Sequence, residues 1–333
     1  MANPGSGGRT SRRIGHVLVR AIVTLVMVAT LNFVLFRVIP GDPASLMLGG
    51  ARTSVTAEQM EAQRQNWGLD RPLFPDQVID YLSATLQGDL GYSFKFRGRH
   101  VADLIVERLP ATIALVGLAQ FIAILCGVML GLYAGWRRGG AVDHIGTGTS
   151  LALYSTPSFW LGMILVVTFS TVLGWLPGYG AYSPGAFARP LDQVLDHLRH
   201  LTLPVAALAL GLIGQYVVVA RAAMSDVVTE DYMVTARAKG LTNGQMLTRH
   251  AFRNAMLPVV TLITLNLGYV VAGAITVEAL FAWPGIGGLT VEALNARDYP
   301  VLQGVFLLLG ASIVVANLIA DLAYGILDPR VRQ

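Results

Sequence analysis

Long apolar runs separated by polar breaks dominate the chain. A helix needs about 20 mostly apolar residues to cross the hydrocarbon core of a bilayer. Six runs reach that length and predict six transmembrane helices, at 14–39, 111–136, 145–173, 203–223, 257–281 and 301–326. Pro40, Gly41, Asp42 and Pro43 should end the first helix. We expect Pro204 and Pro258 in the first turns of the fourth and fifth, where the N–H groups have no helical partner.

The composition agrees with a membrane protein. Hydrophobic residues make up 54% of the 333 residues and the mean hydropathy is +0.57. Charged residues make up 13%, against roughly 25% in an ordinary soluble domain. The net charge of +4 comes from scattered bases, without the Lys/Arg runs of a nucleic-acid patch. Lipid rather than water must therefore cover much of the surface, and we expect no nucleic-acid partner.

The sole cysteine and the basic residues before the first apolar run each have a simple interpretation. The sole cysteine, Cys126, excludes a disulfide within the chain and a cysteine-based metal cluster, and we expect it buried in a membrane helix. Arg9, Arg12 and Arg13 precede the first run as in a signal peptide. That run is longer than the usual roughly 7–15 residues and has no A-x-A-like cleavage site after it. A retained signal-anchor helix is the better interpretation.

The basic residues predict that both termini are cytoplasmic, because loops on the cytoplasmic side carry the excess of Lys and Arg. On the predicted inner side lie Arg9, Arg12, Arg13, Arg20, Arg137, Arg138, Arg221, Arg237, Lys239, Arg249, Arg253, Arg330 and Arg332. The two shorter outer loops hold Arg189, Arg199 and Arg297. The predicted organisation is a cytoplasmic tail 1–13, a first helix 14–39, an extracytoplasmic loop 40–110, a five-helix core 111–326 with a cytoplasmic loop 222–256, and a tail 327–333.

The outer loop 40–110 is long enough to hold a small folded element. Residues 77–86 carry apolar side chains at helical spacing, namely Val78, Tyr81, Leu82 and Leu86. The pattern predicts a short helix there. It suits a docking platform for an external partner and a cap over the mouth of a pore equally well.

The inner loop 222–256 predicts two short helices around a glycine. Thr229 is placed to cap the first helix, with Glu230 and Asp231 in a first turn that favours acids. Gly240 is placed to end it as a left-handed residue. Thr242 and Gln245 form a capping-box pattern for the second helix, which should reach Arg253 with Met246, Leu247 and Ala251 near one face. The loop could lie on lipid headgroups or dock in a groove of a cytoplasmic partner.

Several short motifs in this order resemble one known family. They read LFRVIPGDPA at 35–44, GDLGYS at 88–93, RLPAT at 108–112, DYMVTARAKGL at 231–241, RHAFRNAMLP at 249–258, FAWPGIG at 281–287 and RDYP at 297–300. The chain is similar to ABC importer permeases of the dipeptide/oligopeptide/nickel family, first-permease type. Val234, Thr235 and Ala236 stand where the general motif has Glu-Ala-Ala, and His250 where it has Ile. Both departures are usual in this branch.

The resemblance implies a type I importer fold, all-α with six transmembrane helices, that forms half of a pathway for di- or oligopeptides. Nickel chelates or glutathione are the alternative cargoes. A second permease would complete the pathway, and two ATP-binding-cassette subunits would hold ATP and Mg, with no cofactor in this chain. An extracytoplasmic binding protein would deliver substrate at the plasma membrane of a prokaryote. The ATPase contact would involve Asp231, Tyr232, Thr235, Ala236, Arg237, Ala238, Lys239, Gly240, Leu241, His250, Arg253 and Asn254.

Two other classes fit the residues less well. The chain's two lysines, Lys95 and Lys239, are followed by Phe96 and Gly240, so neither completes a P-loop, which needs G-x-x-x-x-G-K-[ST]. A membrane-embedded enzyme would need catalytic groups at membrane depth, and the serines in the apolar runs have no histidine there. A secondary transporter usually shows internal repeats, and we find none. We therefore expect a transporter subunit that is not itself an enzyme.

Polar residues at membrane depth are candidates for the pathway or its gate. Within the apolar runs they are Gln120, Gln215, Asn266 and Asn317, together with Asn32 and Asp321. Tyr154 near Pro157 could also line the path. Glu278 and Asp298 flank the outer end of the last hairpin, where they could attract a peptide's amino terminus or form a gate. Each amide side chain could instead form a hydrogen bond between helices, and Glu278 and Asp298 could form a solvated rim. Phe159 and Trp160 could line the path or pack beside Pro157, which should kink its helix. Gly268 and Gly273 should allow close helix approach.

Overall fold

The computed structural model describes residues 6–38, 72–96, 98–185, 189–267, 270 and 275–327. The expected turn at 40–43 and the glycines Gly268 and Gly273 lie outside these residues. The described part is helical between its turns, with one isolated antiparallel bridge from Tyr92 to His100. It divides into two compact units, each taken by itself below: Met1–Pro110 with Gly288–Leu322, and Ala111–Gly287 with Ala323–Gln333.

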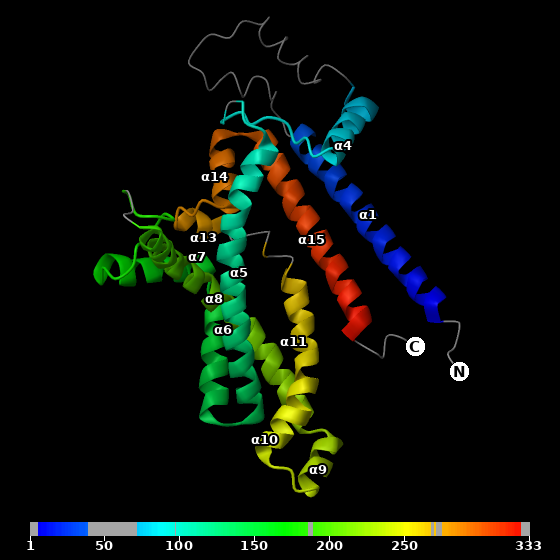
Figure 1. Cartoon of the computed structure of the whole chain (residues 1–333), viewed down its shortest axis with the longest axis vertical. Helices are drawn as coiled ribbons and strands as arrows, with labels where there is room; N and C mark the ends of the chain where they lie inside the picture. Colours follow the sequence, from blue (N-terminus) through cyan, green and yellow to red (C-terminus); the bar gives the residue numbers. More distant parts are fainter. Residues whose placement is uncertain are drawn as a thin grey trace, which may run out of the picture. The chain divides into compact units, whose positions relative to one another are not determined.

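The first unit is built on two long apolar helices, α1 (Ser6–Val38) and α15 (Tyr299–Leu327) (Figure 1). Asn32 Nδ2 donates to the Gln303 carbonyl at 2.9 Å, and a Cβ at Gly310 would overlap the side chain of Val28. These helices therefore lie in direct contact. The unit also holds α4 (Val78–Leu86), the first ten residues of α5 (Val101–Trp136) and most of α14 (Ile286–Ala296).

The helix predicted at 77–86 is confirmed as α4, which follows a π-type turn at Leu73–Gln77. Tyr81 and Leu82 are half-buried and Leu86 is exposed. Tyr81 packs on Phe33 of α1 with ring centroids 5.4 Å apart. The short helix α4 is thus attached to the long apolar helix α1 through an aromatic pair.

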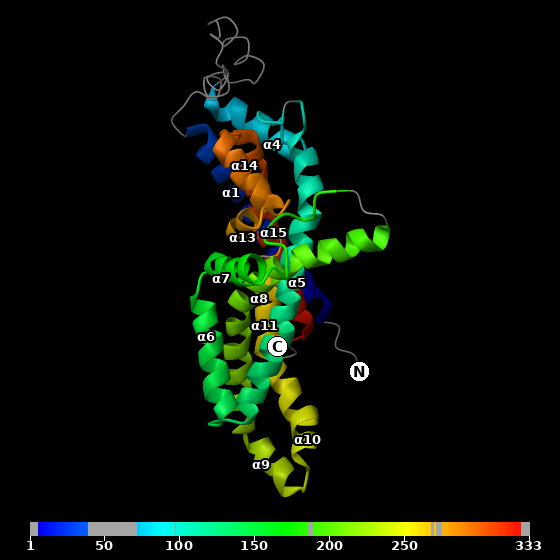
Figure 2. The ribbon, with the colours of Figure 1, turned by 90° about the vertical axis from the view of Figure 1, so that its left-hand side faces the viewer.

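The second unit is a bundle in which α5, α6 (Thr147–Ser155) and α8 (Pro190–Val228) pack side by side (Figures 1 and 2). Its other elements are α7 (Ser158–Leu165), α9 (Asp231–Ala238), α10 (Asn243–Met246), α11 (Phe252–Leu267) and α13 (Ile275–Leu280), with π-helical segments at Val142–Gly146, Val166–Val172 and Leu247–Ala251. The bundle has two buried apolar cores, one around Trp283 and Phe281 and one around Tyr216 and Met224.

Glycines set how closely α5 approaches α8. Gly127, Gly131 and Gly135 repeat every fourth residue of α5, so they share one face. A Cβ at Gly131 would lie 2.5 Å from the Val217 carbonyl oxygen, and one at Gly135 would lie 2.6 Å from that of Arg221. Small residues at this spacing let helix backbones meet in a membrane, where apolar burial gives no preference for protein over lipid.

The helix predicted at 145–173 is wrong as a single span. It forms two pieces, Val142–Ser155 and Ser158–Val172, that meet at 101°. Thr156 is extended (φ −91°, ψ 128°) because the ring of a following proline disfavours the helical region. Pro157 also lacks an N–H. A kink was expected, and the helix instead ends and restarts, with α7 lying across the direction of α6 (Figure 2).

Other predicted boundaries were too narrow. α5 begins at Val101 rather than 111, and α8 runs from Pro190 to Val228 rather than over 203–223. Pro204 and Pro258 therefore lie inside helices and not in their first turns, and Pro110 also lies inside α5. An apolar run predicts only the part of a helix that faces lipid, whereas these helices continue beyond that part into polar sequence. Cys126 lies in α5 as expected but is exposed, because the neighbouring Gly127 faces α8 instead.

Four helical stretches of the described chain are long and apolar enough to cross a membrane, and the bent pair would be a fifth. They are Gly15–Phe36, Val101–Trp136, Pro190–Val228 and Tyr299–Ile319. The expected span 257–281 is represented by α11 and α13, with residues between them outside the description. The count of six and the cytoplasmic placement of both termini stay predictions.

The close contact between α5 and α8 predicts that a larger residue at Gly131 lowers the stability of the fold. Replacing Gly131 with Ala should destabilise the protein by about 1–3 kcal/mol, because the new methyl group overlaps α8. Gly117→Ala on the same helix is the control, since nothing lies within 4 Å of a Cβ there, and the better helix propensity of alanine should make it neutral or stabilising. Thermal unfolding of the purified proteins in detergent would measure both. Equal unfolding temperatures for the two variants would contradict the packing argument.

Candidate functional site

The residues from Thr229 to Met256, within the loop predicted to be cytoplasmic, are called the inner segment, and they begin where α8 ends. Thr229 is the C-terminal cap of α8, and its hydroxyl donates to the Asp226 carbonyl at 2.8 Å. Glu230 is extended (φ −71°, ψ 145°), and α9 starts at Asp231. The prediction that Thr229 caps α9 is therefore wrong, because its hydroxyl is used by the preceding helix. Asp231 in the first turn of α9 is as expected.

The predicted end of α9 is confirmed. Gly240 has φ +77°, the left-handed conformation that favours glycine. The Gly240 N–H donates to the Arg237 carbonyl at 3.0 Å, and the Leu241 N–H donates to the Ala236 carbonyl at 3.3 Å. These two bonds are those of a Schellman motif, which satisfies the last carbonyls of a helix.

The predicted capping box of the next helix is also confirmed. The Gln245 N–H donates to Thr242 Oγ1 at 3.3 Å, and the Thr242 N–H donates to Gln245 Oε1 at 3.0 Å. From Asn243 the chain is helical through α10, the π-helical segment Leu247–Ala251 and α11, without a break until Leu267. The inner helix is thus the beginning of a membrane helix rather than a separate element.

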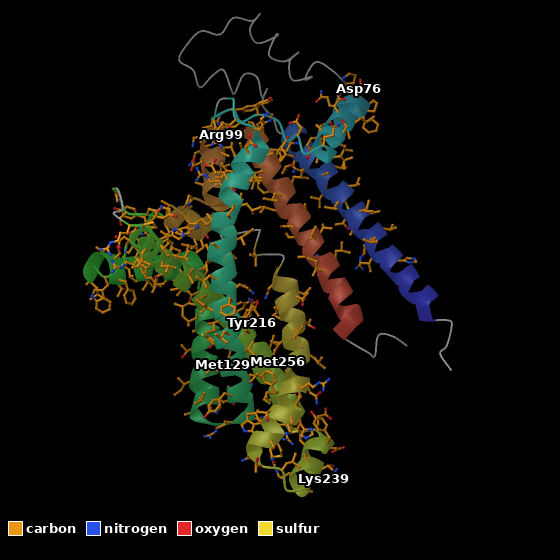
Figure 3. The ribbon with its side chains drawn as sticks, viewed as in Figure 1. Asp76, Arg99, Met129, Tyr216, Lys239 and Met256 are labelled. Carbon is orange, nitrogen blue, oxygen red and sulfur yellow. The ribbon has the colours of Figure 1, made fainter. Side chains whose placement is uncertain are left out.

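The inner segment has an apolar underside and a polar outer face. Met233, Ala236, Met246 and Ala251 are buried and belong to the core around Tyr216. Tyr232 and Asn254 join α9 to α11, with Asn254 Nδ2 donating to the Tyr232 hydroxyl at 2.8 Å. Of the predicted contact residues, Ala236 is buried, Leu241 and His250 are half-buried, and the exposed ones are Asp231, Tyr232, Thr235, Arg237, Ala238, Lys239, Gly240, Arg253 and Asn254. Lys239 lies at the tip of the segment (Figure 3).

Three of the polar residues at membrane depth meet at one point. Gln120 of α5 and Asn266 of α11 both donate to the hydroxyl of Tyr216 on α8, the second bond at 3.0 Å. Tyr216 is fully buried and Gln120 nearly so. The two carboxamides, predicted as pathway candidates, therefore form interhelical hydrogen bonds here.

The remaining polar candidates differ in how far they are exposed. Tyr154 is exposed on α6, Gln215 is half-buried on α8 and Asn317 is exposed on α15. Phe159 and Trp160 are exposed on α7. The side chain of Asp321 lies outside the described part of the chain.

Glu278 is fully buried, so the solvated rim considered for it is wrong. The Thr112 hydroxyl donates to Glu278 Oε1 at 2.8 Å, and the Gly287 N–H donates to Oε2 at 2.7 Å. Thr112 Oγ1 accepts in turn from the Ile286 N–H at 2.8 Å. The carboxylate thus lies at the N-terminus of α14, where the helix dipole favours an anion. A Cβ at Gly285 would overlap this carboxylate, which explains the glycine in this turn.

Asp298 is likewise fully buried and is not part of a rim. Its Oδ2 accepts from the Ser93 hydroxyl at 2.5 Å and from the N–H groups of Phe94 and Lys95 at 3.1 and 2.9 Å. Lys95 Nζ also pairs with Glu292 at 2.9 Å. These contacts hold the end of the GDLGYS motif and the two residues after it onto the turn that precedes α15.

Sequence reasoning missed a buried ion pair. Asp143, 1% exposed, accepts from Arg221 Nε and from Arg221 Nη2, the latter at 2.9 Å. The Gly139 N–H donates to the same carboxylate at 2.9 Å. The pair joins the segment between α5 and α6 to the C-terminal part of α8. The available signal was a single acid beside Arg137 and Arg138 in an otherwise basic loop.

Comparison with known proteins identifies the class. The family described as "Binding-protein-dependent transport system inner membrane component" matches residues 127–333, and its N-terminal companion family matches residues 12–116. The dipeptide transport system permease protein of Escherichia coli (strain K12) is 38% identical over 341 residues, covering 97% of this chain and 98% of that protein. The di/tripeptide transport system permease protein of Pseudomonas aeruginosa (strain UCBPP-PA14) is 39% identical over 340 residues, with the same coverage.

A putative peptide permease protein of Brucella suis biovar 1 is 38% identical over 321 residues, covering 95% of this chain and 98% of that protein. The chain therefore belongs to the family of inner-membrane components of binding-protein-dependent transport systems. It is a multi-pass permease subunit of an ATP-binding-cassette importer, with the all-α type I permease fold.

The hydrogen bonds of Thr112 with Glu278 and Ile286 predict what stabilises the turn before α14. Thr112→Val removes the hydroxyl that donates to Glu278 and accepts from Ile286, and it should lower the free energy of unfolding by about 1–3 kcal/mol. Thr112→Ser keeps the hydroxyl and loses one methyl group, which should cost about 0.8 kcal/mol. Thermal unfolding in detergent would compare them. If Thr112→Ser is as destabilised as Thr112→Val, the hydroxyl does not hold the turn.

Proposed function

We propose that this chain is one of two pathway-forming subunits of an ATP-driven importer of di- or oligopeptides. Support comes from relatives named as dipeptide, di/tripeptide and peptide permeases, which are similar over nearly their whole length. Nickel chelates and glutathione stay alternative cargoes of the same architecture. The proposed location is the cytoplasmic membrane of a prokaryote.

The proposed complex has three further kinds of component. A second permease completes the pathway, two ATP-binding-cassette subunits bind Mg and hydrolyse ATP, and an extracytoplasmic protein delivers the cargo. No cofactor is assigned to this chain. The inner segment around α9 and α10 is the proposed contact with an ATPase subunit, because its outer face is polar and exposed while its underside is anchored in the protein's own core. A short helix presented in this way suits a partner's groove.

The pathway itself is proposed to use side chains that are not already engaged in the fold. Tyr154, Gln215 and Asn317 fit this criterion by their exposure or half-exposure. Gln120, Asn266, Glu278 and Asp298 stay candidates for gating only through movement, since each takes part in hydrogen bonds within its own unit.

Purification and reconstitution would test the proposed function. Tagged protein purified in mild detergent from its native host should co-elute with a second permease and one or two P-loop ATPases. Proteoliposomes of that complex with its binding protein should take up a labelled dipeptide only with ATP, and unlabelled di- and tripeptides should compete. Competition by a nickel chelate or glutathione alone would move the assignment to those cargoes. A chain that elutes alone and transports without ATP would contradict the proposal.

If the turn after α9 transmits movement, a change at Gly240 should affect how ATP hydrolysis is coupled to uptake. Gly240→Val should penalise the left-handed conformation by about 1–2 kcal/mol, displace α9 from α10, and uncouple ATP hydrolysis from uptake. Gly240→Asn is the control, because asparagine visits this conformation more readily. Uptake and binding-protein-stimulated ATPase activity would be measured at matched expression. Normal values of both in Gly240→Val would refute the assignment of this loop.

A further inference from the structure

A single apolar core runs from the inner segment into the membrane part of the second unit. It contains Met233 and Ala236 of α9, Met246 of α10 and, further along, Val259 of α11 and Tyr216 of α8. Met256 packs against this core and lies between Lys239, at the tip of the inner segment, and Tyr216 (Figure 3). Packed side chains of this kind can carry a displacement from one end to the other.

The helical run from Asn243 to Leu267 follows the same direction. It starts at the capping box of the inner segment and reaches Asn266 without a turn or loop. At about 1.5 Å per residue, the stretch from Ala251 to Asn266 covers roughly 22 Å. A push on α10 therefore moves α11 along or about its own axis, unless something holds α11 to its neighbours.

Among the described residues, the hydroxyl of Tyr216 joins α11 to its neighbours through a polar contact at this depth. It accepts from Asn266 of α11 and from Gln120 of α5, so one oxygen joins three helices. Tyr216 is itself held in place, because α5 and α8 pack closely at this level. A Cβ at Gly127 would lie only 2.7 Å from the Tyr216 Cβ. The bridge lies among apolar side chains. It therefore opposes movement of α11 relative to α5 and α8, because a shifted α11 would leave buried polar groups without partners.

We propose that Tyr216 is a positioning residue for transport, whose hydroxyl ties α11 to α5 and α8 so that movement of the inner segment displaces the three helices together. This proposal rests on the proposed function. It assigns Gln120 and Asn266 a mechanical role in place of contact with the cargo. The ring of Tyr216 packs the core, and its oxygen sets the relative position of the helices.

The test is Tyr216→Phe in the complete transporter, reconstituted with its binding protein and a labelled dipeptide. The change keeps the ring and removes one oxygen. We expect ATPase activity to persist and the number of dipeptides imported per ATP to fall about two- to tenfold, the range that follows from losing one buried hydrogen bond. Tyr133→Phe, an exposed tyrosine on α5, is the matched control and should keep the wild-type ratio.

A second variant separates this role from contact with the cargo. Asn266→Leu should lower the same ratio, and the Tyr216→Phe, Asn266→Leu double variant should be no worse than the worse single one, because both changes break one bridge. A wild-type ratio in Tyr216→Phe, or additive losses in the double variant, would overturn the proposal. So would an altered preference among dipeptides at an unchanged ratio, which would place these side chains on the pathway. Failure of the wild-type complex to import would instead refute the proposed function.

Discussion

Polar groups that lie among apolar helices need partners within the protein, because lipid offers none. This constraint explains the positions of the most buried polar residues. Glu278 is satisfied by Thr112 and by the N-terminus of α14, Asp143 by Arg221 and the Gly139 N–H, and Tyr216 by two carboxamides. Each arrangement joins segments that are distant in sequence. The polar residues of this permease thus fix how its helices meet, while the apolar ones make them compatible with the membrane.

The sequence predicted best what local chemistry decides. The capping box at Thr242 and the left-handed Gly240 were found at their expected positions, because backbone geometry within a few residues determines both. The break at Pro157 was underestimated, since the pattern shows that proline weakens a helix and not whether neighbouring helices support a kink or a full turn. The family and its importer class were expected from short motifs, and the comparisons agree.

The pattern of apolar and polar residues in the sequence could not predict residue roles that depend on tertiary partners. Nothing near Glu278 in sequence shows that Thr112 would face it, so a gate and a solvated rim were considered and a buried anchor was not. Gln120 and Asn266 are 146 positions apart, and their shared partner Tyr216 was not among the candidates. The pair Asp143–Arg221 was missed for the same reason. In each case the polar residue was visible in the sequence, and the segment that faces it in the structure was not.

The central claim is that the segment around α9 and α10 meets an ATPase subunit while resting on the permease's own core. Crosslinking would test it most directly, because the native Cys126 is the chain's one cysteine and can be replaced by serine. A cysteine introduced by Lys239→Cys, at the exposed tip, should form a crosslink to a P-loop ATPase in the assembled importer, with a yield that changes when ATP binds. Crosslinks to no ATPase subunit, in a complex that still imports its cargo, would contradict this account.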